Sequence, residues 1–509
     1  MSFKFFEKLK FVYGTSNKKL ILLAVFIISA VPRFALLSAG PFHYDTLDYV
    51  IAGKKTLETG SLHYAHGVGY PFTVVLSAFF QLILGCFSVD EVGTILIATA
   101  VGASLAVVAF FMFVESLFKN KKVAFFSSLA FSFFPPFFSV TTYGRLDHAF
   151  SLFFVALSFY FLLKHLDTKD GKYLIFSSIS FGLGVCTRFS VIWIIFPYIF
   201  TYLYFNLKIR RNKLIIIKNA YTVDKLTFLI FPAMFVVIAL YLPMLLNSGL
   251  SRFVYVISNP YQAKWMGIFT PLLRLSFSWL VKSFTYFGII LIIFGMYLTF
   301  KEKRYSICAF SLLWVLVLML YFGNLSSVSP RFLILPSLPL FFILGFSVYK
   351  IDHFSRHLGL FTIAALIILM IYPIYPILKF RHTHNMQKEF AMYLKNITDE
   401  NAIILAQDES IFLRYYLKDT RTIVNPPVTC NETEMQKFFE KVNTWLDRNR
   451  SVYIIETGFA YDPCKLFLNT LFRNYTVVLV GKHLNEDWHH KSIFSGVFEE
   501  RVFRIERKY

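Results

Sequence analysis

The chain has few charged residues, and this shortage narrows the class of protein. Only 16% of its residues are Asp, Glu, Lys or Arg, whereas about a quarter is usual for a soluble domain. It shows no internal repeat and no low-complexity segment. The strands expected in its polar tail are not followed by a Walker loop or a G-x-G-x-x-G turn, so nothing marks the tail as nucleotide-binding. These absences argue against an ordinary soluble enzyme.

Apolar residues dominate instead, at 56% of the 509 positions. Runs of about 20 apolar residues can cross the bilayer as helices, and such runs recur along the first three quarters of the chain. The first run is too long for the core of a signal peptide, so we expect it to be a retained anchor. We predict about eleven spans, near residues 20–40, 93–117, 123–141, 149–165, 173–187, 189–206, 226–247, 278–300, 305–323, 332–349 and 358–378.

The net charge of +21 lies largely in short segments between spans, which argues for a membrane protein and not for nucleic-acid binding. The apolar stretch 71–85 is short. If it lies flat as an interfacial helix, the basic segments between spans fall on one side of the membrane, which is the cytosolic side. This arrangement places the N-terminus in the cytosol. It places 40–93, 142–148, 248–277, 323–331 and the tail outside.

We predict two domains, a membrane domain at residues 1–378 and an extracytoplasmic α/β domain at residues 379–509. In the tail, "AIILAQ", "SVYIIE" and "TVVLVG" look like buried strands, and "NETEMQKFFEKVNTWLDRN" has helical spacing. Cys430 and Cys464 could form a disulfide if the tail faces an oxidising compartment. The glycosylation sequons at Asn324, Asn396, Asn431 and Asn474 fall on the predicted outer side, which gives mild support.

Carboxylates and arginines from distant loops share this predicted outer face. The first loop carries Asp45 and Asp48, "TTYGRLDH" carries Arg145 and Asp147, and "CTRFS" places an arginine between two spans. Arginine suits phosphate because its planar fork pairs two oxygens and stays charged. A carboxylate among apolar walls can serve as a general base. Together these groups suit a reaction with a phosphate leaving group at the membrane surface.

Simpler interpretations compete with each of these residues. Asp45 precedes a helical pattern and could cap that helix. Arg145 and Arg331 stand at span ends, where arginines commonly reach head groups. A transporter or lipid flippase would place charges on broken helices near the midplane, whereas Lys282, near an outer end, is the main charge expected within a span. The histidines have no reliable metal-ligand spacing.

Five motifs in order resemble the GT-C glycosyltransferases, and most closely their protein O-mannosyltransferase and lipid A aminoarabinose transferase group. The motifs are "YDTLDYVIAGKKTLETG", "HGVGYPFTVVLSAFFQLILG", "YGRLDH", "YLIFSSISFGLGVCTRFSVIWIIFP" and "SPRFLILPSLPL". They cover roughly residues 20–350. The Lys-Pro-Pro of the aminoarabinose enzymes and the W-W-D of oligosaccharyltransferases are absent, which argues against those activities.

The resemblance implies a polytopic GT-C fold and a transferase that takes a sugar from a polyprenyl-phosphate donor at the non-cytosolic face, with inversion. It matches Asp45 to the catalytic base. Thr46 stands where the group often has Glu, so Asp48 could compensate or be the base itself, and Phe332 replaces a frequent Tyr. The expected catalytic residues are Asp45, Asp48 and Asp147. The expected substrate-binding residues are Arg145, His148, Arg188, Arg331, His66 and Tyr70.

The expected partners are a lipid-phosphate-linked sugar, the membrane, and an acceptor that is a protein, a glycan or a lipid. No cofactor is certain. Some members of the group bind a divalent metal and others need none, and carboxylates from two loops could hold one. The expected location is the cell membrane, or the endoplasmic reticulum in a eukaryote. The sequence leaves open which sugar is moved and what the tail does.

Overall fold

The structure is a computed structural model in which the chain divides into two compact units. One unit comprises Met1–Leu37 and Tyr49–Leu378, and the other comprises Ser38–Asp48 and Lys379–Tyr509. The residues it describes are 17–65, 68–206, 209–210, 213–214, 220–250, 253–254, 270, 279–324, 329–407, 409–417, 421–459, 462, 464–484 and 499–508. Each unit has its own core and is taken in turn.

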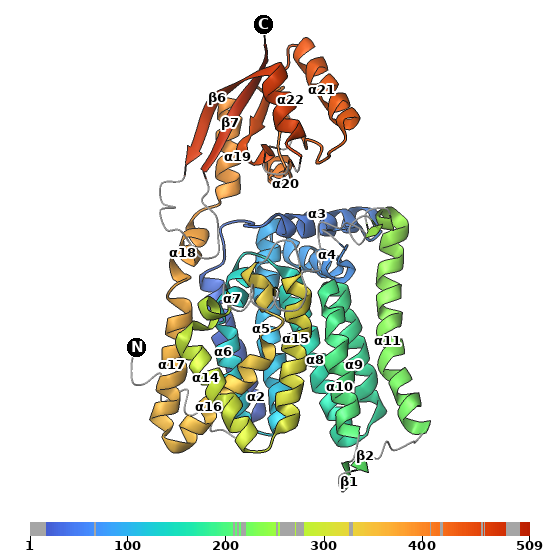
Figure 1. The fold of residues 1–509 in the computed structure, drawn as a ribbon, viewed down its shortest axis with the longest axis vertical. Helices are drawn as coiled ribbons and strands as arrows, with labels where there is room; N and C mark the ends of the chain where they lie inside the picture. Colours follow the sequence, from blue (N-terminus) through green and yellow to red (C-terminus); the bar gives the residue numbers. More distant parts are fainter. Residues whose placement is uncertain are drawn as a thin grey trace. The chain divides into compact units, whose positions relative to one another are not determined.

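The first unit is a bundle of helices (Figure 1). Its helices are α2 (Lys18–Ala35), α3 (Tyr44–Thr59, shared with the other unit), α4 (Pro71–Gly85), α5 (Glu91–Phe118), α6 (Lys121–Ser132), α7 (Pro135–Thr142), α8 (Leu146–Thr168), α9 (Gly171–Thr187), η1 (Phe189–Ile194), α10 (Ile195–Asn206), α11 (Ala220–Met244), η2 (Leu245–Gly249), α14 (Val281–Lys301), α15 (Tyr305–Gly323), η4 (Pro330–Leu333), α16 (Leu338–Phe354), α17 (Arg356–Ile371) and α18 (Tyr375–Thr383, mostly beyond the unit boundary). The short strands β1 (Ile209–Arg210) and β2 (Lys213–Leu214) pair antiparallel.

The predicted polytopic helical fold is confirmed, and every predicted span contains a helix. Fewer than the expected eleven are long and apolar enough to cross a membrane by themselves. Among the described residues five helices qualify, or up to seven if each of two bent pairs forms one span. The number falls because runs such as 173–187 and 332–349 form helices of only 17 residues. Stretch 71–85 forms the short helix α4, with 15 residues.

One bent pair, α6 and α7, is held by a buried arginine from α2. The two helices meet at 58°, and the break leaves carbonyl oxygens at the end of α6 without helical partners. Arg33 is fully buried and donates to Ser132 O at 2.7 Å and to Thr141 Oγ1 at 3.0 Å. Its remaining hydrogen bonds reach Ser132 Oγ and both oxygens of Ser29. Arg33 therefore replaces the missing helical bonds where water is excluded.

Helix α4 positions the polar end of the bundle. Its Ser77 hydroxyl donates to Tyr49 O at 2.7 Å, and Gln81 Nε2 donates to Val50 O at 3.0 Å, so α4 is joined to the second part of α3. Its Thr73 hydroxyl donates to Thr187 O at 2.8 Å, at the end of α9. Helix α4 thus connects the loop between the first spans to the point where α9 ends.

The second unit contains the α/β domain predicted for the tail. Its sheet has the order β4-β3-β5-β7-β6. Strands β4, β3 and β5 are parallel, and β7 runs antiparallel to both of its neighbours, β5 and β6. The strands are β3 (Ile403–Leu405), β4 (Thr422–Val424), β5 (Val452–Ile455), β6 (Tyr475–Leu484) and β7 (Glu499–Arg507). The helices are α19 (Met386–Ile397), α20 (Ser410–Leu417), α21 (Glu432–Asp447), η5 (Glu456–Phe459) and α22 (Leu466–Asn474).

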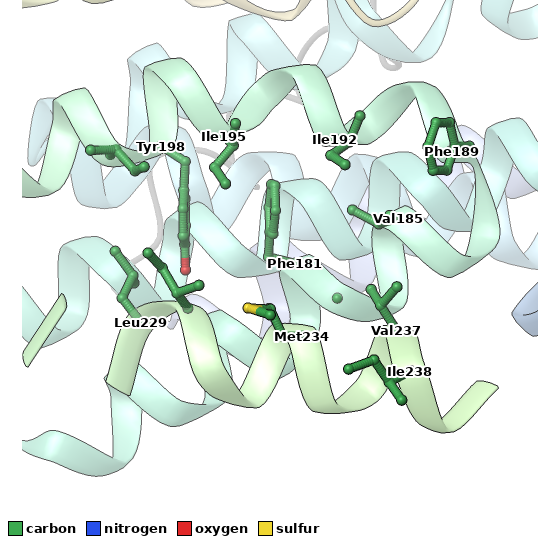
Figure 2. A pocket seen from close by; sticks show the side chains of 14 residues that line it. Phe181, Val185, Phe189, Ile192, Ile195, Tyr198, Leu229, Met234, Val237 and Ile238 are labelled. Carbon is green, nitrogen blue, oxygen red and sulfur yellow. The ribbon is translucent and has the colours of Figure 1, made fainter. Parts of the chain in front are cut away.

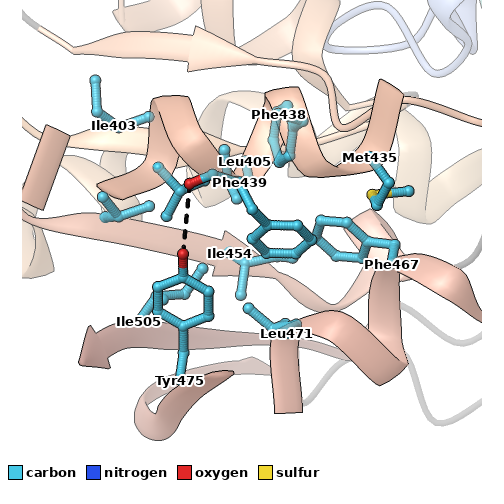
Figure 3. Packing of buried hydrophobic residues seen from close by; sticks show 12 residues of the cluster. Ile403, Leu405, Met435, Phe438, Phe439, Ile454, Phe467, Leu471, Tyr475 and Ile505 are labelled. Carbon is cyan, nitrogen blue, oxygen red and sulfur yellow. Dashed lines mark hydrogen bonds between the residues drawn. The ribbon is translucent and has the colours of Figure 1, made fainter. Parts of the chain in front are cut away.

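Strand alternation gives this sheet two apolar faces. Ile403 and Leu405 join a core with α21 and α22, whereas Ile404 joins a second core with α19 and α20, as the two-residue period of a strand requires. Figure 3 shows the first core, where Phe439, Phe467 and Tyr475 lie together. The three predicted strands and the predicted helix are all present. Strand β6 differs in burial, since Leu479 is 54% exposed.

Cys430 and Cys464 form the disulfide that the sequence allowed. It joins the residue before Asn431, the N-cap of α21, to the segment just before α22. The bond spans 34 residues of sequence, and closing a loop of this size in the unfolded chain is worth about 3–4 kcal/mol in the chain-entropy model. The disulfide therefore contributes to the stability of the core that α21 and α22 share.

We expect Cys430→Ser to lower the free energy of local unfolding of this domain by about 2–4 kcal/mol, because the unfolded segment regains its freedom. Hydrogen–deuterium exchange of the full chain, followed at the amides of β3 and β5, measures this loss. Cys86→Ser is the matched control, since Cys86 is an exposed free thiol in the other unit. Unchanged protection in Cys430→Ser would contradict the assignment.

Candidate functional site

A tight turn between α7 and α8 brings charged residues to the start of a buried helix. Gly144 adopts φ +93°, which a residue with a Cβ rarely tolerates. Arg145 follows as the N-cap of α8, and Asp147 lies in the first helical turn. A carboxylate in that turn is favoured by the positive end of the helix dipole. The turn therefore places an arginine and an aspartate side by side.

Asp147 is the centre of the site and is fully buried. Arg145 binds it through two parallel hydrogen bonds, Nε to Oδ1 and Nη2 to Oδ2, both at 2.9 Å. Arg188, from the end of α9, donates from Nη1 to Oδ2 at 2.6 Å. One carboxylate is thus shared between two guanidinium groups, and it fixes the position of both.

The backbone and a histidine also hold Arg188 in place. It is the C-cap of α9, and its N–H donates to Gly184 O at 2.9 Å. Its Nε donates to Ser190 Oγ at 3.1 Å, and its Nη1 lies 2.5 Å from His148 Nε2. Since a guanidinium only donates, His148 Nε2 accepts this bond and its proton lies on Nδ1. His148 is therefore neutral in this arrangement.

A third arginine lies near the same cluster. Arg331, in η4, is close enough to His148 to interact with it electrostatically. It is half-buried, and its guanidinium lies 5.5 Å from the centre of the Phe332 ring. Phe332 in turn stacks on Phe322 of α15 at 5.2 Å. The segment from η4 thus brings another positive charge to the Asp147 cluster.

Guanidinium groups predominate in this cluster. Arg145, Arg188 and Arg331 supply three positive charges, Asp147 supplies one negative charge, and His148 is neutral. Arg145 and Arg188 are 2% and 7% exposed, so water screens them poorly. Buried guanidinium groups bind anionic oxygens strongly. The arrangement therefore suits an anionic group with several oxygens.

An apolar cavity has Phe189, the residue after Arg188 in the sequence, in its wall. Its volume is about 220 Å³, and side chains from α9, η1, α10 and α11 line it (Figure 2). Phe189 lies at one end, and Leu229 and Tyr198 lie at the other. On the α11 side, Met234 and Ile238 are more than half exposed, as expected of a surface that faces lipid. The cavity offers space for a hydrocarbon chain, and its lining residue Phe189 directly follows Arg188 in the sequence.

The first-loop aspartates belong to the other unit, whose boundary falls after Asp48. Asp45 lies in the first turn of α3 and is only 1% exposed. Its Oδ2 lies 3.4 Å from His43 Nδ1, and its N–H donates to the same nitrogen at 3.2 Å. Asp48, one turn later, is half-buried. Asp45 therefore has the more desolvated carboxylate, the environment that favours a general base.

The other predicted residues have separate outcomes. His66 lies outside the described residues. Tyr70 precedes α4 with φ +44°, and its ring centre lies 6.5 Å from that of Tyr49. Within the described ranges, no group of three or more His, Cys, Asp or Glu side chains could hold a metal ion. The oxygens of Asp147, one of the carboxylates predicted for the site, are bonded to the guanidinium groups of Arg145 and Arg188.

Sequence reasoning overlooked several residues that matter here. Ser190 stands two positions after Arg188, within the quoted "CTRFS". Tyr321 of α15 interacts electrostatically with Arg188 and packs on Trp193 at 5.2 Å, which no sequence signal indicated. Lys282 was expected to be the main charge within a span, but it is exposed at the start of α14. Arg33 is the deeply buried charge instead, because it bonds to the break between α6 and α7.

One family model matches the part of the chain that carries the Asp147 cluster. The family model of dolichyl-phosphate-mannose-protein mannosyltransferases matches residues 71–236, a stretch that includes Arg145, Asp147, His148 and Arg188. No curated protein sequence matches the chain.

Solved structures give more extensive matches. ArnT from Cupriavidus metallidurans in the apo state is 11% identical with a TM-score of 0.54, and 95% of this chain and 97% of that chain are covered. ArnT bound to undecaprenyl phosphate gives 10% identity, a TM-score of 0.50 and the same coverage. Mycobacterial arabinofuranosyltransferase AftD matches with 12% identity, a TM-score of 0.49, and coverage of 97% of this chain and 42% of that chain.

The likeness to ArnT covers nearly the whole of both chains and shows a shared fold. The predicted GT-C-like fold, a helical membrane region followed by an extramembrane domain with a small sheet, is therefore confirmed. The resemblance to the protein O-mannosyltransferase and aminoarabinose transferase group is confirmed as well.

We expect Asp147→Asn to destabilise the membrane unit by about 3–5 kcal/mol, because the variant leaves two buried guanidinium groups without their carboxylate. Thermal unfolding of the full chain in lipid nanodiscs measures the effect. Asp167→Asn is the matched control on the same helix, since Asp167 forms an exposed ion pair with Lys119, and such pairs contribute little. Equal melting of the two variants would refute the central role of Asp147.

Proposed function

We propose that the chain is a membrane glycosyltransferase that takes a sugar from a polyprenyl-phosphate donor. The observation that supports this most is the cluster in which Arg145 and Arg188 bind Asp147 and Arg331 interacts electrostatically with His148. A phosphate has the charge and the oxygens that guanidinium groups bind, and Arg188 and Arg145 are already oriented by Asp147. The leaving phosphate would be stabilised by groups that need no rearrangement.

The apolar cavity next to Arg188 supports a lipid as the carrier of that phosphate. The cavity starts at Phe189 and is lined by apolar side chains, so the first isoprene units could lie there while the phosphate meets the arginines. The ArnT structure with the same fold contains undecaprenyl phosphate, and the matching family model is that of enzymes described by dolichyl-phosphate-mannose. Both observations support a donor of this class for this chain.

In the proposed reaction, the acceptor hydroxyl attacks the anomeric carbon of the donor sugar. The bond from the acceptor oxygen to this carbon forms as the bond from the carbon to the phosphate oxygen breaks, with inversion. Asp45 takes the hydroxyl proton, and the bond electrons leave with the polyprenyl phosphate. The near-complete burial of Asp45 supports its role as the base over Asp48. The acceptor is a protein, a glycan or a lipid.

We further propose that the tail lies on the non-cytosolic side and that the N-terminus is cytosolic. The Cys430–Cys464 bond supports this orientation, because disulfides persist mainly in oxidising compartments. The placement of basic residues between the spans supports it independently. The donor would then be used at the outer surface of the membrane.

The donor site can be tested by binding alone. We expect undecaprenyl phosphate to raise the melting temperature of the nanodisc protein, whereas undecaprenol, the same chain without phosphate, should not. Arg331→Gln should weaken this binding about 10–100-fold, the value of a charged hydrogen bond. Arg304→Gln, in the turn between α14 and α15, is the control and should bind as the wild type does. Equal stabilisation by both lipids would overturn the phosphate assignment.

The reaction can be tested by turnover. We expect the wild type, given a panel of polyprenyl-phosphate sugars and candidate acceptors, to release lipid phosphate, and Asp45→Asn to lose about 100-fold or more of this rate, as removal of a general base does. Binding of undecaprenyl phosphate should persist in Asp45→Asn. Loss of turnover in Asp48→Asn but not in Asp45→Asn would move the base by one helical turn. Tight donor binding with transport and no turnover would favour a flippase.

A further inference from the structure

A polar cavity lies in the second unit, between α21, α22 and the end of β7. Its volume is about 570 Å³, within the roughly 300–1,000 Å³ of small-molecule sites. It belongs entirely to the α/β domain, and the proposed transfer reaction assigns it no role. Its lining is mostly polar, unlike the apolar cavity near Arg188.

Helix α21 presents a row of hydrogen-bonding side chains to this cavity. Glu432, Gln436, Glu440 and Asn443 all line it, and their spacing of four, four and three residues places them on one helix face. The buried residues of the same helix, such as Phe438 and Val442, face the sheet instead. The polar row is therefore separate from the face that holds the domain together.

Arg473 of α22 also lines the cavity. Four of the polar lining residues are exposed: Glu432, Gln436, Glu440 and Arg473. Their side chains form no hydrogen bond or ion pair with the residues that the structure describes. The cavity thus offers carboxylate and amide acceptors on one wall and a guanidinium donor on another. These groups are available to a ligand without breaking internal bonds.

The base of the cavity is partly aromatic. Phe439 and Tyr475 line it, and their rings stack with centres 5.6 Å apart (Figure 3). The Tyr475 hydroxyl donates to Asn443 Oδ1 at 2.8 Å, so the Asn443 amide nitrogen is left to donate to a ligand. The site therefore combines an apolar base with fixed polar groups.

We propose that this cavity binds a neutral saccharide. Sugar hydroxyls both donate and accept hydrogen bonds, so they can use the carboxylates of α21 and the guanidinium of α22 together. An anion would meet Glu432 and Glu440, and a cation would meet Arg473, Arg507 and Lys508, which also line the cavity. The C–H faces of a sugar ring suit the apolar base. This role goes beyond the proposed transfer reaction, because binding here requires no donor.

Binding of disaccharides to the full chain tests the proposal. The protein is placed in lipid nanodiscs, since sugar-headed detergents would compete, and no donor is added. Saturation-transfer NMR is recorded with disaccharides of glucose, mannose, galactose and N-acetylglucosamine, and with inorganic phosphate as a competitor. We expect at least one disaccharide to bind, phosphate not to displace it, and Glu440→Ala and Arg473→Ala each to weaken binding by about tenfold or more.

Glu434→Ala is the matched control, because it removes an exposed glutamate from the same helix outside the cavity. It should bind as the wild type does, and equal melting temperatures would show that all variants are folded. Absence of binding by every disaccharide, displacement by phosphate, or equal binding in Glu440→Ala and the control would each overturn the proposal. Lipid-phosphate release is measured separately, so sugar transfer could persist after this inference had failed.

Discussion

Asp147 is the group on which the arrangement of the membrane unit depends. It is fully buried and binds two arginines that come from different helices, at the start of α8 and the end of α9. A buried carboxylate needs charged partners, and buried guanidinium groups need a carboxylate. This mutual requirement fixes the two helix ends relative to each other. A third arginine, Arg331, interacts electrostatically with His148, the residue next to Asp147.

Arg33 differs from the arginines of the Asp147 cluster, because it binds neutral oxygens and no carboxylate among the described residues. All five of its hydrogen bonds go to neutral oxygens, mostly at the break between α6 and α7. The rings of Phe137 and Phe138 lie about 5 Å from its guanidinium and add cation–π contact. Its donors are therefore engaged within the protein, and it stabilises a bend. Arg145 and Arg188 are instead bonded to the carboxylate of Asp147, which holds their two guanidinium groups next to each other.

Much of the fold and part of the site could be predicted from the sequence. Long apolar runs located the helices, because a membrane-spanning segment must satisfy its own backbone, and short apolar runs in the polar tail located β3 and β5. The pair Arg145 and Asp147 was visible because only one residue separates them in a single motif. Tyr321 was not predictable, because it packs on Trp193 from a helix more than a hundred residues further along the chain. Ser190 was within sight of the motif, but only the geometry of η1 turned its hydroxyl toward Arg188.

The sequence by itself determined that this is a polytopic membrane protein with a polar α/β tail, because hydrophobicity and periodicity are local properties of the chain. It also determined which residue types could bind a phosphate or take a proton. Only the tertiary structure decided that Asp147 pairs with both arginines, that His148 accepts from Arg188, and that Arg33 bonds to a bend. These are contacts between distant segments, and their strength comes from the exclusion of water that packing produces.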